Sequence, residues 1–186
     1  MKELSLNILD IAENSVKAKA SLTEILLTQT ESELTIVIQD NGCGMDEETV
    51  RRVTDPFYTT RTTRPVGLGL PLLKLEAEMT GGHVTVQSRD QTAYPDDHGT
   101  VVTAVFNHTH IDCPPLGDVT GTIVTLVQGH PDTDFLFRHE CAGKETVELD
   151  TRALREVLGD IPLNSFEVLQ WIQGSLSEAY GQWETT

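Results

Sequence analysis

The chain has 186 residues, of which 38% are hydrophobic, and it carries a formal charge of −16 at pH 7. This length and apolar content suit one folded domain, with or without an extension, and exclude an intrinsically disordered chain. The negative charge makes nucleic acid and anionic membranes poor partners. There is no signal-peptide pattern and no apolar run of membrane-spanning length, and the three cysteines have unrelated spacings. We therefore expect a cytoplasmic protein with reduced thiols and no membrane association.

Hydrophobic periodicity predicts alternating helices and strands over the first 110 residues. A helical pattern covers residues 3–19, and two β-rich runs at 22–28 and 34–39 form an expected hairpin that ends in a glycine turn at 40–44. The other expected elements are a short helix at 46–53, a polar loop at 54–66, a helix at 67–79, and strands at 83–88 and 100–106.

A proline-rich stretch at 113–117 is the clearest domain boundary, so we expect one domain at 1–112 and an extension at 118–186. Residues 119–128 fit a strand, because they are rich in β-branched residues, or a helix capped by Asp118. We favour the helix. Beyond it the sequence predicts a hairpin at 135–149 and helices at 151–158 and 165–180.

Asn7, Asp10 and Asn14 form a polar stripe on the first predicted helix. A carboxylate and an amide one turn apart can place a proton acceptor beside a hydroxyl group and a carbonyl oxygen on Mg²⁺. The alternative is that these side chains only face solvent. Glu13 precedes Lys17 by four residues, so we assign it to a surface ion pair.

Asp40 stands where a predicted strand ends in a glycine turn. Its carboxylate can accept a hydrogen bond from the exocyclic amine of adenine, while Gly42 and Gly44 let the backbone approach a flat ring. The alternative is an ordinary Asx turn. Gly67-Leu68-Gly69 opens a helix, where free backbone N–H groups can bind phosphate. Residues 51–74 hold five cationic side chains against one acid, which also indicates a bound anion.

These motifs follow one another along the chain in an order that resembles a known family. They are, in order, Asn14, Asp40-x-Gly42-x-Gly44, residues 55–60, Gly67-Leu68-Gly69-Leu70 and Gly99-Thr100. The series is similar to the N, G1, F, G2 and G3 boxes of the superfamily of gyrase, histidine kinases, the large heat-shock chaperone and mismatch-repair ATPases. The resemblance implies an α/β (α+β) two-layer sandwich, in which helices cover one face of a mixed sheet, with a small C-terminal α/β extension.

The resemblance also implies ATP and Mg²⁺ as cofactors and a role for each motif residue. Asn14 would coordinate Mg²⁺, and Asp40 would bind the adenine amine beside Gly42, Gly44 and Thr100. Phosphate contacts would come from Gly67, Leu68 and Gly69, and a lid at 55–66 would be anchored by Phe57 and Thr60, with Arg61 near the γ-phosphate. Two departures stand out: Asp10 occupies the position of a catalytic glutamate, and Arg61 that of a lysine.

We therefore expect a regulatory protein kinase, similar to histidine kinases and anti-sigma serine kinases, with Asp10 as its catalytic residue. No dimerisation helix precedes the motifs, so the phosphoacceptor would lie on a separate partner protein, and residues 118–186 would dock that partner or a second copy of the chain. The alternative is an ATP-gated interaction module or slow ATPase. His139 superficially resembles a phosphoacceptor but lies in an expected strand, and the histidines and cysteines at 108–141 match no zinc module. Trp171 and Trp183 mark either a partner surface or core.

Overall fold

A computed structural model describes residues 3–53 and 69–184 as helices, strands and connecting loops. The helices are α1 (Leu4–Lys17), α2 (Glu47–Arg52), α3 (Gly69–Met79), α4 (Val119–Gly129), α5 (Thr151–Leu158) and α6 (Phe166–Glu184). The strands are β1 (Leu22–Gln29), β2 (Glu33–Asp40), β3 (His83–Arg89), β4 (Gly99–Asn107), β5 (Asp134–Cys141) and β6 (Val147–Asp150). The expected helices and strands are confirmed within four residues at their ends, whereas the expected loop at 54–66 and the first two residues of the helix at 67–79 lie outside the described residues.

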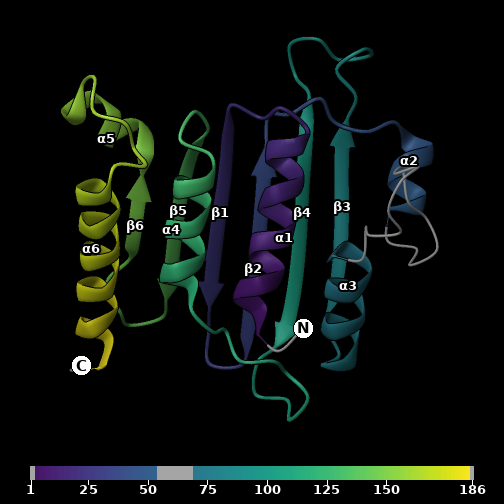
Figure 1. The fold of residues 1–186 in the computed structure, drawn as a ribbon. Coiled ribbons are helices and arrows are strands. Elements are labelled where there is room, and N and C mark those ends of the chain that lie inside the picture. The colour runs from purple at the N-terminus through teal and green to yellow at the C-terminus, as the bar shows by residue number, and fades with distance from the viewer. Residues whose placement is uncertain (1–2, 54–68, 185–186) are drawn as a thin grey trace.

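Within the described residues, six strands form one sheet in the order β3-β4-β2-β1-β5-β6. Strands β1 and β5 are parallel, and the other neighbouring pairs are antiparallel, so the sheet is mixed. Figure 1 shows α1, α3, α4 and α6 side by side on one face of this sheet. The predicted fold, a mixed sheet covered on one face by helices, is confirmed.

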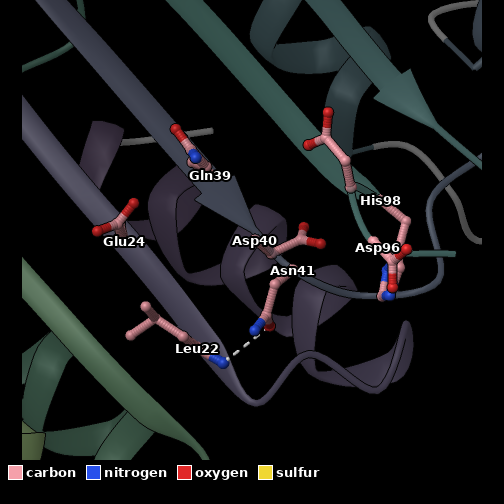
Figure 2. A pocket seen from close by; sticks show the side chains of 8 residues that line it. Leu22, Glu24, Gln39, Asp40, Asn41, Asp96 and His98 are labelled. Carbon is pink, nitrogen blue, oxygen red and sulfur yellow. Dashed lines mark hydrogen bonds between the residues drawn. The ribbon is translucent and has the colours of Figure 1, made fainter. Parts of the chain in front are cut away.

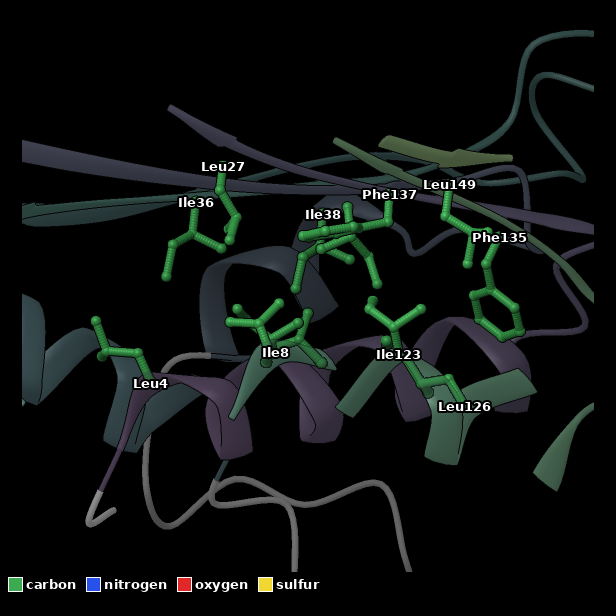
Figure 3. Packing of buried hydrophobic residues seen from close by; sticks show 14 of the residues in the cluster. Leu4, Ile8, Leu27, Ile36, Ile38, Ile123, Leu126, Phe135, Phe137 and Leu149 are labelled. Atoms are coloured by element: carbon green, nitrogen blue, oxygen red, sulfur yellow. The ribbon is translucent and has the colours of Figure 1, made fainter. Parts of the chain in front are cut away.

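The core lies between this helical layer and the sheet. Alternate residues of each central strand point toward the helices, as the two-residue period of a strand requires, and are almost fully buried. Figure 3 shows Leu27, Ile36 and Ile38 of the sheet facing Ile8 of α1 and Ile123 of α4. The apolar stripe of α1 therefore fixes which of its faces is left for polar residues.

The segment after residue 118 continues the same sheet and the same core. Strand β5 pairs along its whole length with β1, and α4 packs beside α1. The first N–H groups of α1, which have no partner inside the helix, donate to the carbonyls of Pro115 and Leu116 at 2.9 and 2.8 Å. Residues 119–129 are helical, and Asp118 caps them by accepting a hydrogen bond from Gly121 N. The favoured helix is thus confirmed over the strand.

Helix α6 is joined to the sheet by a cluster of three rings. His139 of β5 is 1% exposed, its Nδ1 lies 2.9 Å from the hydroxyl of Tyr180, and its ring packs edge-on against Trp183. Burial lowers the pKa of His139 to about 4 and raises that of Tyr180. Trp183 is thus partly buried and packed against the core, and His139 is a buried structural residue. None of the helices in residues 3–53 and 69–184 combines the length and apolar character needed to cross a membrane.

The lowered pKa of His139 predicts acid sensitivity of the fold. The folded state favours the neutral ring, so the stability that His139 contributes is fully present above the unfolded pKa of about 6.5 and is lost as the pH falls toward about 4. Between neutral pH and about pH 5, the unfolding free energy of the wild type should therefore fall by about 2 kcal/mol more than that of His139→Gln. Urea unfolding at both pH values measures this, with the exposed His83→Gln as control. Equal pH dependence in the two variants would contradict the assignment.

Candidate functional site

Helix α1 carries three predicted polar residues, and the structure separates their roles. Asp10 and Asn14 are exposed, and their side chains make no hydrogen bond or ion pair with other residues that the structure describes. Asn7 is buried instead, and its Nδ2 donates to Glu76 Oε2 of α3 at 2.5 Å. Asn7 therefore tethers α3 to α1, while Asp10 and Asn14 are free to contact a ligand.

Asp40 ends strand β2 with both carboxylate oxygens already oriented. Ser15 of α1 donates its hydroxyl to Asp40 Oδ2 at 2.7 Å, and the backbone N–H of Gly42 donates to Oδ1 at 2.9 Å. Ser15 is 3% exposed and directly follows Asn14. This hydrogen bond therefore links α1, at the residue that follows the predicted magnesium ligand Asn14, to the predicted adenine residue Asp40, and the carboxylate keeps lone pairs for a further donor.

The predicted glycines mark places where two backbones lie close together. A Cβ on Gly42 would lie 2.8 Å from Ala18 O, and one on Gly44, whose φ is +68°, would lie 1.9 Å from Arg89 O. Gly99 has a φ of +137°, and its Cβ would lie 2.0 Å from Asp40 O. At these glycines the backbone of the turn after β2 packs closely against the end of α1 and against the β3–β4 connection. The glycines are therefore required by the protein's own packing, in addition to any ligand.

Thr100 lies directly opposite Asp40 in the pairing of β4 with β2, on the helix-covered face. Beside it, the Ser88 hydroxyl accepts a hydrogen bond from Met45 N, donates to Gly99 O and lies 2.8 Å from Thr100 Oγ1. Since Ser88 donates its proton to Gly99, the threonine hydroxyl is the donor of the remaining bond. Thr100 Oγ1 then keeps acceptor lone pairs for a water or ligand beside Asp40.

The start of α3 meets the same part of α1. A Cβ on Gly69, the first residue of α3, would lie 3.4 Å from the Asp10 Cβ and 3.5 Å from its Oδ2. The structure thus brings Gly69 and Asp10 together. The other predicted contacts lie outside the described residues: Phe57, Thr60, Arg61, Gly67 and Leu68.

Two electrostatic expectations need correction. Within the predicted cationic segment, Arg51, Arg52 and Lys74 lie near Glu47, Glu48 and Glu78 as (i, i+4) ion pairs. Their charge is largely balanced by acids on the same helices, so they do not indicate a bound anion. Glu13 pairs with His130 Nε2 at 2.7 Å, and no ion pair with Lys17 forms in the described structure, because the end of α4 lies against α1.

Sequence reasoning missed Ser15 and Ser88. In the helical pattern of residues 3–19, Ser15 falls on the same face as Leu4, Ile8 and Ile11, and a hydroxyl at a buried helical position requires a hydrogen-bond partner. Its place beside Asn14 was the available signal. Ser88 gives no comparable signal, because a serine near the end of an edge strand is ordinary and its three contacts come from separate segments.

A pocket of about 390 Å³ opens near this site, between the ends of β1 and β2 and the β3–β4 connection (Figure 2). Its lining includes Glu24 and Gln39, which alternate with the buried residues of their strands and so belong to the face without helices. Its lining residues are Leu22, Glu24, Gln39, Asp40, Asn41, Asp96, Asp97 and His98. With four acids and neither Lys nor Arg in this lining, the pocket does not suit a triphosphate.

The four histidines between residues 108 and 139 have separate partners. His108 Nε2 lies 2.9 Å from Thr30 O, His110 lies beside Asp112, and His130 and His139 make the contacts already described. In the described part of the chain, no three His, Cys, Asp or Glu side chains lie together as metal ligands would.

Comparison with known proteins agrees with the fold and the order of the motifs. Residues 2–110 match the family described as "Histidine kinase-, DNA gyrase B-, and HSP90-like ATPase". The chain is 38% identical over 95 residues to the "Tetrathionate sensor histidine kinase TtrS" of Salmonella typhimurium, covering 51% of this chain and 16% of that protein. It is 35% identical over 99 residues to the "Sensor histidine kinase YvrG" of Bacillus subtilis, covering 50% of this chain and 16% of that protein.

Among solved structures, the Aquifex aeolicus MutL ATPase domain complexed with ADP is similar in fold, with a TM-score of 0.51 and 15% identity. The alignment covers 85% of this chain and 69% of that one. The described elements define the nucleotide-binding sandwich of the superfamily of gyrase, histidine kinases, the large heat-shock chaperone and mismatch-repair ATPases. The chain belongs to the histidine kinase-, DNA gyrase B- and HSP90-like ATPase family, which confirms the predicted resemblance. Its first 110 residues are an ATP-binding domain homologous to histidine kinase catalytic domains, although the chain spans only about a sixth of those relatives' length.

The close packing at Gly42 can be tested without a ligand. In Gly42→Ala the new methyl group would lie 2.8 Å from both Cβ and O of Ala18, so we expect a loss of roughly 1–3 kcal/mol in unfolding free energy. Gly174→Ala is the matched control, because this glycine lies inside α6 with no atom within 4 Å, and should stabilise by up to about 1 kcal/mol. Urea unfolding compares the two variants. A Gly42→Ala protein as stable as the Gly174→Ala protein would contradict the described packing.

Proposed function

We propose that this chain binds Mg·ATP and transfers the γ-phosphate to a separate regulatory partner protein. One observation carries the proposal: Asp40 is held by Ser15 and Gly42 on the helix-covered face, and Ser15 directly follows the exposed Asn14, whose side chain has no partner among the described residues. The proposal includes the cytoplasmic location that the sequence leads us to expect. The proposed activity goes beyond membership of the family, because the chain covers only 16% of each aligned relative.

Adenine selection is proposed to depend on Asp40. Because the Ser15 hydroxyl and the Gly42 N–H both donate to it, the carboxylate is fixed and presents its remaining lone pairs as acceptors. The exocyclic amine of adenine is a donor and matches that surface, whereas the corresponding carbonyl of guanine is an acceptor and does not. Gly42, Gly44 and Thr100 would complete this end of the site, the threonine through its acceptor lone pairs.

Metal binding is proposed to depend on Asn14. Mg²⁺ prefers oxygen ligands, and it commonly takes few of them from the protein and the rest from phosphate and water. An exposed amide oxygen that has no partner in the described structure fits that requirement. When bound, the metal would neutralise phosphate charge. The Gly67, Leu68 and Gly69 backbone would bind the phosphates, Arg61 would lie near the γ-phosphate, and Phe57 and Thr60 would anchor the lid.

Asp10 is the proposed catalytic residue. It lies one helical turn before Asn14, is exposed, and lies against Gly69 at the start of α3, where a phosphate would be bound. From there its carboxylate can accept the proton of an attacking hydroxyl or water. A histidine acceptor would need little such help, because a neutral imidazole nitrogen already has a free lone pair.

An ATP-gated interaction module is the second candidate. Helix α1, which carries Asp10 and Asn14, also packs against α4 of the C-terminal segment, and Glu13 bonds His130 there. Nucleotide binding on one side of α1 could thereby alter the surface that the C-terminal segment presents to a partner. In that case hydrolysis would be slow and no phosphate would reach the partner.

Base selectivity tests the adenine assignment. Wild-type protein should bind ATP well and GTP poorly, and Asp40→Asn should weaken ATP binding by about 1–3 kcal/mol, because an amide N–H would then face the adenine amine. Isothermal titration calorimetry in Mg²⁺ measures both affinities. Glu24→Gln makes the same carboxylate-to-amide change on the other face of the sheet and should leave ATP affinity unchanged. Equal affinity of the wild type for ATP and GTP would show that Asp40 does not read the base.

Turnover tests the role of Asp10. Asp10→Asn keeps the size of the side chain and removes its proton acceptor, so we expect near-normal ATP affinity and a turnover loss of roughly 10²–10⁴-fold. Radiolabelled ATP is incubated with a candidate partner, and released phosphate and labelled protein are scored separately. Asp132→Asn, at an exposed loop acid, is the matched control. Labelled partner that is lost in Asp10→Asn supports the kinase, whereas released phosphate alone favours the gated module. Unchanged turnover in Asp10→Asn would remove this residue from the chemistry.

A further inference from the structure

A buried polar side chain lies in the contact between α1 and α3. Asn7 is 1% exposed, and its Nδ2 donates to Glu76 Oε2 at 2.5 Å, whereas its Oδ1 has no hydrogen-bond partner in the described structure. A buried amide with one unsatisfied acceptor costs more free energy than an apolar side chain in the same place. Packing alone therefore does not explain an asparagine at this position.

Asn7 and Glu76 lie on the helix faces that also carry the proposed phosphate site. Glu76 follows Gly69 by seven residues, which is a turn of about 700°, so the two residues point within about 20° of one direction and lie about 10.5 Å apart along α3. On α1, Asn14 follows Asn7 by the same seven residues. Between them lies Asp10, whose Cβ would be 3.4 Å from a Cβ on Gly69. The two helices therefore meet at two points, one at the site and one below it.

The apolar residues of α3 do not fix its position on α1 by themselves. Most of them are leucines: Leu70, Leu72, Leu73 and Leu75. Similar apolar side chains can replace one another in a contact at little cost, whereas a hydrogen bond between two particular side chains is satisfied in one arrangement only. A shift of α3 by one residue would move Glu76 by about 1.5 Å along the helix and about 100° around it. Such a shift would break the bond to Asn7.

We propose that Asn7 and Glu76 are positioning residues for the phosphate groups of ATP. Their hydrogen bond holds the start of α3 beside Asp10, where the first backbone N–H groups of the helix, which have no partner inside it, donate to bound phosphates. The inference rests on the proposed function, because it requires phosphate to be bound at the start of α3.

The adenine end of the site does not depend on this bond. Asp40 and Thr100 belong to β2 and β4, which pair directly with each other, and Asp40 is held by Ser15 and by the Gly42 N–H. A change in the position of α3 therefore moves the phosphate contacts and leaves the adenine contacts in place. Loss of the bond between α1 and α3 should weaken binding of ATP and leave binding of adenosine unchanged.

The test exchanges the donor and the acceptor of the bond. Asn7→Asp keeps the size of the side chain but removes the donor and sets a carboxylate against that of Glu76, so ATP affinity should fall by about 10-fold or more. Adenosine affinity should change by less than about 2-fold. The double variant Asn7→Asp/Glu76→Gln forms the bond again with the roles reversed, because the new amide donates to the new carboxylate. It should restore ATP affinity to within about 3-fold of the wild type.

Titrations followed by NMR measure both affinities, including weak binding of adenosine. They are made with Mg²⁺ at about pH 8, so that two facing carboxylates do not share a proton. Glu78→Gln is the matched control, because it makes the same carboxylate-to-amide change at an exposed position of α3 and should leave both affinities unchanged. Asn7→Ala removes the donor without adding a charge. It should give the same selective loss of ATP affinity, and it replaces Asn7→Asp if that variant does not fold.

Three results would overturn the inference while leaving the proposed phosphotransfer intact. The first is wild-type ATP affinity in the Asn7 variants. The second is an equal loss of affinity for ATP and adenosine in folded variants, because the whole site would then be disturbed. The third is a double variant that binds ATP as weakly as Asn7→Asp alone. A wild type that binds ATP no more tightly than adenosine would overturn the proposed phosphate site and this inference with it, so the wild-type titration separates the two failures.

Discussion

Helix α1 must bury one face on the sheet and leave another face available beside the start of α3. Leu4, Ile8 and Ile11 fill the core, and this packing fixes the rotation of the helix. Each residue advances the helix by 100°, so a shift of one position would move Asp10 away from Gly69 and Ser15 away from Asp40. Ser15 serves both requirements, because it is buried together with Leu4, Ile8 and Ile11 and its hydroxyl donates a hydrogen bond to Asp40. The rest of the site depends on that single orientation.

Periodicity and turn chemistry predicted most of the fold, because these signals are local. Apolar spacing gave the helices, alternation gave the strands, and Asp118 with Gly129 correctly outweighed the β-branched residues between them. The order of the boxes added the family, which then implied the sheet and its one-sided helical cover. Asp40 and Thr100 lie opposite each other because they stand at the end of β2 and the start of β4, which are antiparallel neighbours in the sheet, and Gly44 follows in the turn after β2.

Contacts between distant segments could not be predicted in the same way. The proline-rich boundary suggested a separate extension, but β5 pairs with β1 across more than a hundred residues, and nothing local in either strand specifies its partner. Glu13 bonds His130, although Lys17 is the closer cation in sequence, because the end of α4 lies against α1. The sequence allows Trp171 and Trp183 to belong to the core or to a partner surface, and the rotation of α6 decides between these alternatives. That rotation leaves Trp171 exposed and packs Trp183 against His139.

The shared sheet has a consequence for how the two ends of the molecule can influence each other. Helix α6 packs on α4, α4 packs on α1, and the first N–H groups of α1 bond to the segment that leads into α4. These contacts are apolar packing and backbone hydrogen bonds, which resist relative movement more than a flexible linker would. A partner bound to the C-terminal segment would therefore be held at a fixed position relative to Asp10 and Asn14. Fixed placement of an acceptor favours phosphoryl transfer, because the reacting groups no longer have to find each other by diffusion.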